Sequence, residues 1–156
     1  DYTLVFCLRT NKETNKEEVM LGMKKRGFGE GKYNGFGGKL EPGETVEQAA
    51  VRELEEESGV ITNVNSLNKK GYLVFNMEDS NKLMKVHVYT VTNFTGDGVE
   101  TEEMLPLWVD INAMPFDNMW VDDPYWFPYL KAGKRFVGRF DYSNDQTITS
   151  YELQEV

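Results

Sequence analysis

Short apolar runs separated by polar turns dominate the first part of the chain. Residues 2–8 read Tyr-Thr-Leu-Val-Phe-Cys-Leu, an apolar, aromatic and β-branched run that predicts a buried strand. The polar segment 11–18 separates it from a second apolar run at 19–23, so the two predict an antiparallel hairpin. Seven glycines then fall within 27–43, and a segment so rich in glycine is expected to form neither regular helix nor strand.

Signals for a helix follow the glycine-rich segment. Thr45 and Gln48 have the spacing of a capping box, which predicts a helix that begins here and runs to about Ser58. Gly59 stands where a residue with left-handed backbone commonly ends a helix.

The second half of the chain predicts further strands and one more helix. Strands are expected at 71–77, 83–94 and 105–109, and a closing hairpin at 136–142 and 147–153. Asp123 and Pro124 are predicted as the N-cap and first position of a helix that runs to about Lys131. Strands mixed with two helices indicate an α/β domain with a mixed sheet.

Length and composition are those of a folded domain. The chain has 156 residues, of which 40% are hydrophobic and 13% aromatic, and a chain of this size buries roughly 70% of its unfolded surface. We therefore expect a single domain over residues 1–156. No apolar run approaches the roughly 20 residues needed to cross a bilayer, and no signal segment opens the chain, so no membrane partner is expected.

Charge and rare residues exclude several classes of function. The net charge of −9 makes binding to a nucleic acid backbone unexpected, because that requires a cationic surface. Cys7 is the only cysteine, which excludes an internal disulfide and favours the cytoplasm, with the nucleus and mitochondria left open. His87 is the only histidine, which excludes zinc sites with two histidines. We expect a monomer.

The predicted helix carries a strongly acidic face. Glu53, Glu56 and Glu57 are spaced so that they project from one side of a helix, while Ala50, Val51 and Leu54 can pack against the sheet. Each like-charge pair four residues apart costs roughly 0.2–0.5 kcal/mol, which a bound cation would offset. Oxygen ligands alone favour Mg²⁺ or Mn²⁺ over zinc. Taken alone, three glutamates are more often a solvated face.

The full pattern around these glutamates is more specific. It reads Gly, five residues, Glu, seven residues, then Arg-Glu-aliphatic-x-Glu-Glu-x-Gly-aliphatic, at Gly38, Glu44, Arg52, Glu53, Leu54, Glu56, Glu57, Gly59 and Val60. This pattern resembles the signature of the Nudix hydrolases. The resemblance implies the Nudix fold, a mixed β-sheet sandwiched between α-helices, and hydrolysis of a nucleoside diphosphate linked to another group. Mg²⁺ would neutralise the phosphate oxygens and lower the pKa of the attacking water.

The resemblance also assigns roles within the signature. It implies metal ligands at Glu53, Glu56, Glu57 and the main-chain carbonyl of Gly37, with one of the glutamates acting as general base. Arg52 would orient a helix carboxylate, a task that suits its planar guanidinium. Glu44 would steady the loop.

Outside the signature, the chain resembles the animal members of the family that act on oxidised purine nucleoside triphosphates. The likeness includes the segments 21–29, 34–39, 86–88 and 125–128. It implies cleavage of 8-oxo-dGTP and 2-hydroxy-dATP to the monophosphate and pyrophosphate, which would sanitise the nucleotide pool. It places Trp120 against the purine, Phe28 and Phe75 in the pocket wall, Asn34, Asp122 and Asp123 at the base edge, Thr3 and Lys24 at the nucleoside, Phe36, Gly37, Gly38 and Lys39 in the substrate site, and Glu103 in the metal shell.

Adjacent aspartates in an aromatic pocket would share a proton, because burial and like charge both raise the pKa of a carboxyl group. A mobile proton would let Asp122 and Asp123 accept a guanine-like or an adenine-like edge. The alternative is that Asp123 is an ordinary helix cap. Two other functions stay open. The first is a Nudix hydrolase that acts on ADP-ribose or a dinucleoside polyphosphate, and such an enzyme would lack the set Asn34, Asp122 and Asp123. The second is a nucleotide sensor without turnover, in which the acidic helix is usually broken.

Overall fold

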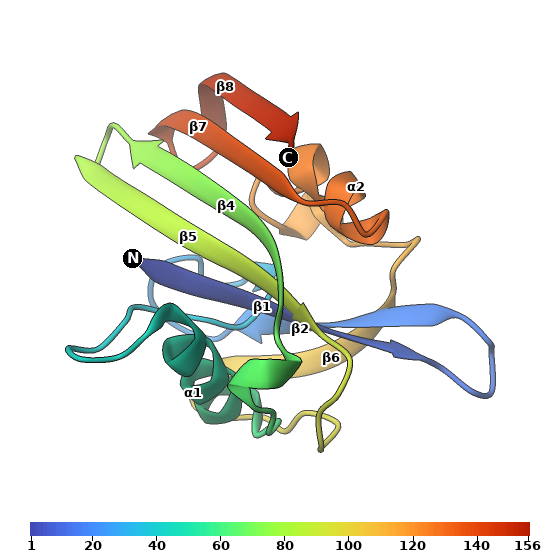
Figure 1. Ribbon diagram of the computed structural model, residues 1–156. Coiled ribbons are helices and arrows are strands. Elements are labelled where there is room, and N and C mark those ends of the chain that lie inside the picture. The colour runs from blue at the N-terminus through green and yellow to red at the C-terminus, as the bar shows by residue number, and fades with distance from the viewer.

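The computed structural model describes residues 1–156 as one mixed eight-stranded sheet with two α-helices (Figure 1). The strands are β1 (Tyr2–Thr10), β2 (Glu17–Lys24), β3 (Tyr33–Asn34), β4 (Asn68–Met77), β5 (Lys82–Val91), β6 (Met104–Asp110), β7 (Phe136–Asn144) and β8 (Thr147–Glu155). The helices are α1 (Val46–Ser58) and α2 (Asp123–Lys131), with 3₁₀ turns η1 (Val64–Ser66) and η2 (Phe116–Asn118). The strand order is β3-β2-β1-β5-β4-β7-β8, and β6 pairs with β2. The pairs β1–β5 and β4–β7 are parallel.

The side chains of the central strands point alternately to the two faces of the sheet and form a separate hydrophobic core on each face. In β1, Val5 and Cys7 join the core that contains Leu54 of α1, whereas Phe6 between them joins the core that contains Trp126 of α2. Because neighbouring side chains of a strand point to opposite faces, α1 and α2 cover opposite sides of the sheet. The predicted sandwich of a mixed sheet between helices is confirmed.

Local sequence signals set both ends of α1, as predicted. The hydroxyl of Thr45 accepts a hydrogen bond from the Gln48 backbone at 3.1 Å, and the Gln48 side chain accepts one from the Thr45 backbone at 2.9 Å. Gly59 ends the helix with φ of 73°, in the left-handed region where glycine has no steric penalty. The helix that carries the glutamates therefore starts and stops where its sequence specifies.

Two local predictions were wrong. The glycine-rich segment contains the short strand β3, and Phe36 forms a further bridge with Val5 of β1. Its backbone finds these partners only when β1 and β2 lie beside it, so local composition could not reveal them. At α2 the N-cap is Asp122 rather than Asp123, and its side chain makes no capping hydrogen bond.

The strand limits differ modestly from the predicted ones. β4 begins at Asn68, before the predicted start, and β5 ends at Val91, before the predicted end at residue 94. Phe94 lies beyond the strand and stacks on Trp108 at 5.9 Å between ring centroids, which explains its apolar character. Neither helix is long and apolar enough to cross a membrane. Cys7 is buried, and burial raises the pKa of its thiol to about 12.

Candidate active site

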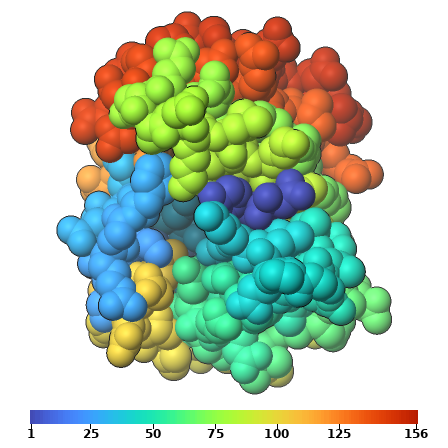
Figure 2. All heavy atoms as spheres, turned by 90° about the vertical axis from the view of Figure 1, so that its left-hand side faces the viewer, coloured from blue at the N-terminus to red at the C-terminus, as the bar shows by residue number.

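A cavity of about 310 Å³ opens beside β1 and extends from the start of α2 to the glycine turn that faces α1. Figure 2 shows the molecule hollowed between the light-blue segment near residue 30 and the dark-blue N-terminal residues, with the yellow-green β4–β5 hairpin above. The predicted substrate residues that line it are Thr3, Lys24, Phe28, Asn34, Gly37, Gly38, Lys39, Phe75, Trp120, Asp122 and Asp123. Segments far apart in the sequence thus meet around one space.

Phe36 is the one predicted substrate residue that the structure does not bring to the cavity. Its side chain is fully buried in the core beneath α1, against Val5 and Met104. The edge of the Phe36 ring also packs closely against β2, since a Cβ atom on Gly22 would lie 2.8 Å from it. Regular alternation would place Phe36 on the same side as Asn34, but β3 ends at Asn34 and Phe36 instead pairs with Val5 of β1. Phe36 therefore joins the core that contains Val5, and its prediction is corrected to a core residue.

Asp122 and Asp123 form a buried carboxyl pair at one end of the cavity. Their exposed fractions are 3% and 2%. The Asp122 carboxylate accepts hydrogen bonds from the Trp126 indole at 2.7 Å and from the Tyr142 hydroxyl. In contrast, Oδ2 of Asp123 is buried without any hydrogen-bond partner. Burial raises the pKa of both carboxyl groups, and the charge of Asp122 raises that of Asp123 further.

This arrangement favours one of the two interpretations of the pair. A capping aspartate would accept a backbone N–H of the first helical turn, and the N-cap of α2 has no such side-chain bond. A buried carboxyl oxygen without a partner is costly and rare unless something binds it. We therefore interpret Asp123 as a group directed at a ligand, with Asp122 held in place by Trp126 and Tyr142.

Aromatic and amide groups complete this end of the cavity. The rings of Phe28 and Trp120 lie 4.9 Å apart between centroids, and Phe28 is 52% exposed. The Asn34 carbonyl oxygen accepts the Gly35 N–H at 2.8 Å, so its amide N–H groups are available to a ligand. A flat aromatic face beside amide and carboxyl groups suits the stacking and edge recognition of a purine.

The buried pair predicts a stability that falls as the pH rises. A carboxyl group whose pKa in the folded state is raised above 3.8 keeps its proton in the native state at a pH where the unfolded chain loses it. Its contribution to the free energy of unfolding is therefore complete below pH 3.8 and is lost as the pH rises through the folded-state pKa. Each proton contributes a slope of at most about 1.4 kcal/mol per pH unit. Unfolding of the native chain and of Asp123→Asn by urea, from pH 4 to 8, should show that their stability difference changes with pH. A constant difference would contradict the raised pKa.

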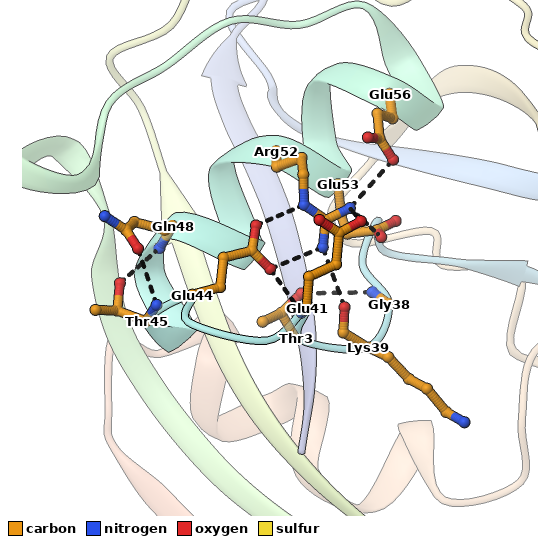
Figure 3. A network of polar contacts seen from close by, with 10 residues as sticks. All are labelled: Thr3, Gly38, Lys39, Glu41, Glu44, Thr45, Gln48, Arg52, Glu53 and Glu56. Atoms are coloured by element: carbon orange, nitrogen blue, oxygen red, sulfur yellow. Dashed lines mark hydrogen bonds and ion pairs between the residues drawn. The ribbon is translucent and has the colours of Figure 1, made fainter.

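On the other side of the sheet, Arg52 organises the acidic face of α1 (Figure 3). Its guanidinium donates to both oxygens of Glu44 at 2.6 and 2.9 Å, to Glu53 at 2.8 Å and to Glu56 at 3.2 Å. The bidentate bond from Arg52 lowers the pKa of Glu44 to about 2. Glu44 also accepts the backbone N–H of Glu41 at 2.8 Å, so the loop before α1 is tied to the helix, as the resemblance implied.

Glu57 links α1 to the cavity. Its carboxylate accepts the Gly37 N–H at 3.0 Å, and it is the one glutamate of the acidic face that lines the cavity. Desolvation raises its pKa to about 7, although the bond from Gly37 opposes this. The backbone here passes very close to β1, since a Cβ on Gly37 would lie 1.7 Å from the carbonyl oxygen of Thr3. Only glycine permits this approach.

The donor chemistry of this region fits a hard divalent cation. Glu53, Glu56 and Glu57 each use one carboxylate oxygen in the hydrogen bonds described and leave the other without one. The Gly37 carbonyl accepts no backbone hydrogen bond either. Oxygen donors of this kind match Mg²⁺, Mn²⁺ or Ca²⁺. The three carboxylates are not gathered around one point, and Glu53 and Glu56 are both hydrogen-bonded to Arg52.

Glu103 is arranged differently. One of its oxygens accepts from Lys24 at 3.2 Å and the other from Arg26 at 2.6 Å, so neither is free of a cationic partner. Glu103 lies near Glu57, whose pKa its charge raises. Its role in the metal shell remains a prediction, and taking part would require it to exchange a side-chain cation for the metal.

Gly38 faces the acidic helix at close range. A Cβ at this position would lie 2.8–2.9 Å from the carboxylate atoms of Glu53. Because the obstacle is the end of a flexible side chain, Gly38→Ala should move Glu53 with little loss of stability. We expect turnover to fall at least about 10-fold, since small displacements of catalytic groups are costly. Turnover and melting temperature measured together check this, and a variant that melts normally with full activity would contradict a role for Glu53.

Several residues of the site carried no recognisable sequence signal. Tyr142 and Trp126, which hold Asp122, look like ordinary core residues of β7 and α2. Lys32 and Lys82 line the cavity from a loop and a strand start. The contact of Trp126 with Asp122 follows from their spacing of four residues along α2. Tyr142, Lys32 and Lys82 lie beside the site because distant segments of the chain meet there, and no local spacing rule links them.

Comparison with known proteins agrees with this geometry. The NUDIX domain matches residues 3–130. An oxidized purine nucleoside triphosphate hydrolase from mouse (Mus musculus) is 46% identical over 155 residues, covering 99% of this chain and 94% of that protein. Its namesake from zebrafish (Danio rerio) is 49% identical over 138 residues, covering 88% and 87%. A MutT protein from Bacillus halodurans superposes with a TM-score of 0.79 over 99% of this chain and 98% of that one, at 23% identity.

The signature glutamates on a capped helix, the mixed sheet between two helices and the match over most of the chain lead to one conclusion. This chain belongs to the Nudix family.

Proposed function

We propose that this protein hydrolyses oxidised purine nucleoside triphosphates to the monophosphate and pyrophosphate, and so removes damaged nucleotides from the pool. It is a nucleoside triphosphate pyrophosphohydrolase of the Nudix family. The observation that carries the substrate class is the buried pair Asp122 and Asp123, which lines the cavity together with Trp120 and Asn34 and in which one oxygen of Asp123 has no hydrogen-bond partner. The relatives from mouse and zebrafish are named for this activity, and an 8-oxo-dGTP diphosphatase from Haemophilus influenzae is 37% identical over half the chain.

The shape of the cavity orients the substrate. With the purine between the aromatic rings and the aspartates, the phosphates extend toward the Gly37–Gly38 turn. Thr3 braces this turn, because its backbone N–H donates to the Gly38 carbonyl at 2.9 Å. The Gly37 N–H of the same segment donates a hydrogen bond to Glu57. The base is thus read at one end and the phosphate chain is presented to the acidic helix at the other.

The aspartate pair reads the base edge through its proton. Asp122 accepts from Tyr142 and Trp126, which favours its ionised form, so the shared proton resides mainly on Asp123. A protonated Asp123 donates a hydrogen bond to the base, and a proton shift toward Asp122 turns it into an acceptor. One site can then hold a guanine-like edge, as in 8-oxo-dGTP, and an adenine-like edge, as in 2-hydroxy-dATP.

Nudix hydrolases use a divalent cation. We assign Mg²⁺ here, with Mn²⁺ as a substitute, and Glu53, Glu56, Glu57 and the Gly37 carbonyl as the groups that hold it. When bound, the cation neutralises phosphate charge and acidifies water. One of the three glutamates accepts the proton of the attacking water, and Arg52 keeps two of them in position. We expect the protein to act as a monomer on a free nucleotide, in the cytoplasm.

A substrate panel whose products are identified by chromatography tests the function, because hydrolysis of ADP-ribose or of a dinucleoside tetraphosphate releases no pyrophosphate. The panel contains 8-oxo-dGTP, 2-hydroxy-dATP, dGTP, ADP-ribose and a dinucleoside tetraphosphate, each with Mg²⁺. We expect the two oxidised nucleotides to give the highest kcat/KM and to release pyrophosphate. Preference for ADP-ribose or the dinucleotide would replace the proposed substrate class. Binding without turnover of any of them would indicate a nucleotide sensor.

A further inference from the structure

The cavity is lined by four lysines, an unexpected number in a chain of net charge −9. Lys24 forms an ion pair with Glu103. The other three, Lys32, Lys39 and Lys82, have no carboxylate within 4.0 Å and donate no side-chain hydrogen bond. Lys32 lies at the base end, over the Trp120 ring at 5.3 Å and close enough to Asp123 to lower its pKa by charge. Lys39 and Lys82 differ from Lys32 in that they lie away from the aspartate pair, and neither forms an ion pair.

The side chain of Lys82 is directed to the mouth of the cavity. It is the first residue of β5, directly after a turn that contains Glu78 and Asp79. Neither of these nearby carboxylates pairs with it. Its ammonium instead lies 5.6 Å from the ring centroid of Tyr2 and 4.9 Å from that of Phe28, two residues that themselves line the cavity. The lysine therefore bridges β1 and the loop after β2 across the opening.

Lys39 approaches the same ring from the glycine turn. Its ammonium lies 5.8 Å from the Tyr2 centroid, and its backbone forms a bridge with Tyr2. Two ammonium groups thus lie around one aromatic ring without an anion between them. Lys39 directly follows the Gly37–Gly38 turn, along which the phosphates reach the acidic helix. A polyphosphate that crosses Tyr2 on this path meets both cations.

We propose that Lys82 binds the phosphate tail of the substrate, together with Lys39 and across the ring of Tyr2. This inference rests on the proposed function, because it takes the ligand to be a nucleoside triphosphate. Lys82 offsets part of the repulsion between that ligand and the glutamates of α1. The cation–π contacts with Tyr2 and Phe28 keep the side chain extended over the opening before the ligand arrives.

Binding measured in EDTA separates this role from catalysis. The affinities of 8-oxo-dGTP and 8-oxo-dGMP are determined by calorimetry for the native chain, Lys82→Gln, Lys82→Arg and Lys85→Gln. Lys85 is the matched control, because it is an exposed lysine of the same strand that does not line the cavity. Melting temperatures verify that each variant is folded.

We expect Lys82→Gln to raise the Kd of the triphosphate roughly 10-fold and that of the monophosphate by less than about 3-fold, as for loss of one charged hydrogen bond. Lys82→Arg should retain most of the affinity, and Lys85→Gln all of it. If Lys82→Gln weakened the binding of both ligands equally, Lys82 would only support Phe28. If the affinities were unchanged, Lys82 would contact neither ligand. Either result would overturn the proposal. A native chain that binds neither ligand would instead overturn the proposed function.

Discussion

Replacing Glu56 by Gln is expected to lower turnover of 8-oxo-dGTP about 100- to 1000-fold while leaving the fold and base binding intact. The side chain of Glu56 is 58% exposed and touches only Arg52, so the isosteric amide can still accept that bond. What it removes is a negative charge on the face that is to hold the cation. Loss of one preorganised electrostatic contact at a reacting centre typically has this cost. Pyrophosphate release measures the effect.

The neighbouring Glu55 supplies the control for this experiment. It lies on the same helix, is exposed, and forms no side-chain hydrogen bond or ion pair. Glu55→Gln makes the same chemical change one residue away and should keep full turnover. If Glu56→Gln also kept full activity over a range of Mg²⁺ concentrations, the assignment of Glu56 to the metal would be wrong.

The second large effect is expected from the aspartate pair. Asp123→Asn should lose about 100-fold in kcat/KM on 8-oxo-dGTP or on 2-hydroxy-dATP and less on the other, because an amide cannot exchange a proton to present either a donor or an acceptor at the same atom. A site built to hydrogen-bond a group discriminates strongly when that bond is lost. Kinetics with both substrates, run side by side, measure the change in preference.

Asp122→Asn is expected to be less specific. Its amide nitrogen would face the donors of Trp126 or Tyr142, which costs about 1–3 kcal/mol of stability in addition to activity. The exposed Asp117 in η2 provides the control, and Asp117→Asn should change neither property. Unchanged activity of both pair variants on both substrates would refute the shared-proton account.

The sequence predicts best what depends on neighbouring residues. The limits of α1 follow from Thr45, Gln48 and Gly59, whose capping contacts span four residues or fewer, and both limits are confirmed. The glutamates of α1 share a face because of helical periodicity alone. The continuous apolar run at residues 2–8 likewise indicated the buried strand that is now β1.

Features that depend on pairing between distant segments could not be predicted. The strand β3 exists because β2 offers Gly22 and Met23 as partners. Asp122 is held by Tyr142, which reaches it through the parallel pairing of β4 and β7. Phe36 was assigned to the substrate site through its neighbours in the sequence, yet the sheet turns it to the opposite face.

The separation of the two cores by the sheet has a consequence for how such enzymes diversify. Under the proposed function, the base is bound beside α2 and the β4–β5 hairpin, whereas the bond is cleaved beside α1, and the short turn at Gly37 and Gly38 is common to both regions. Substitutions around Asp123, or at Met77 of β4, which also lines the cavity, are therefore expected to change the preferred nucleobase without displacing the glutamates of α1. Engineering of altered selectivity should target the first region and spare that turn.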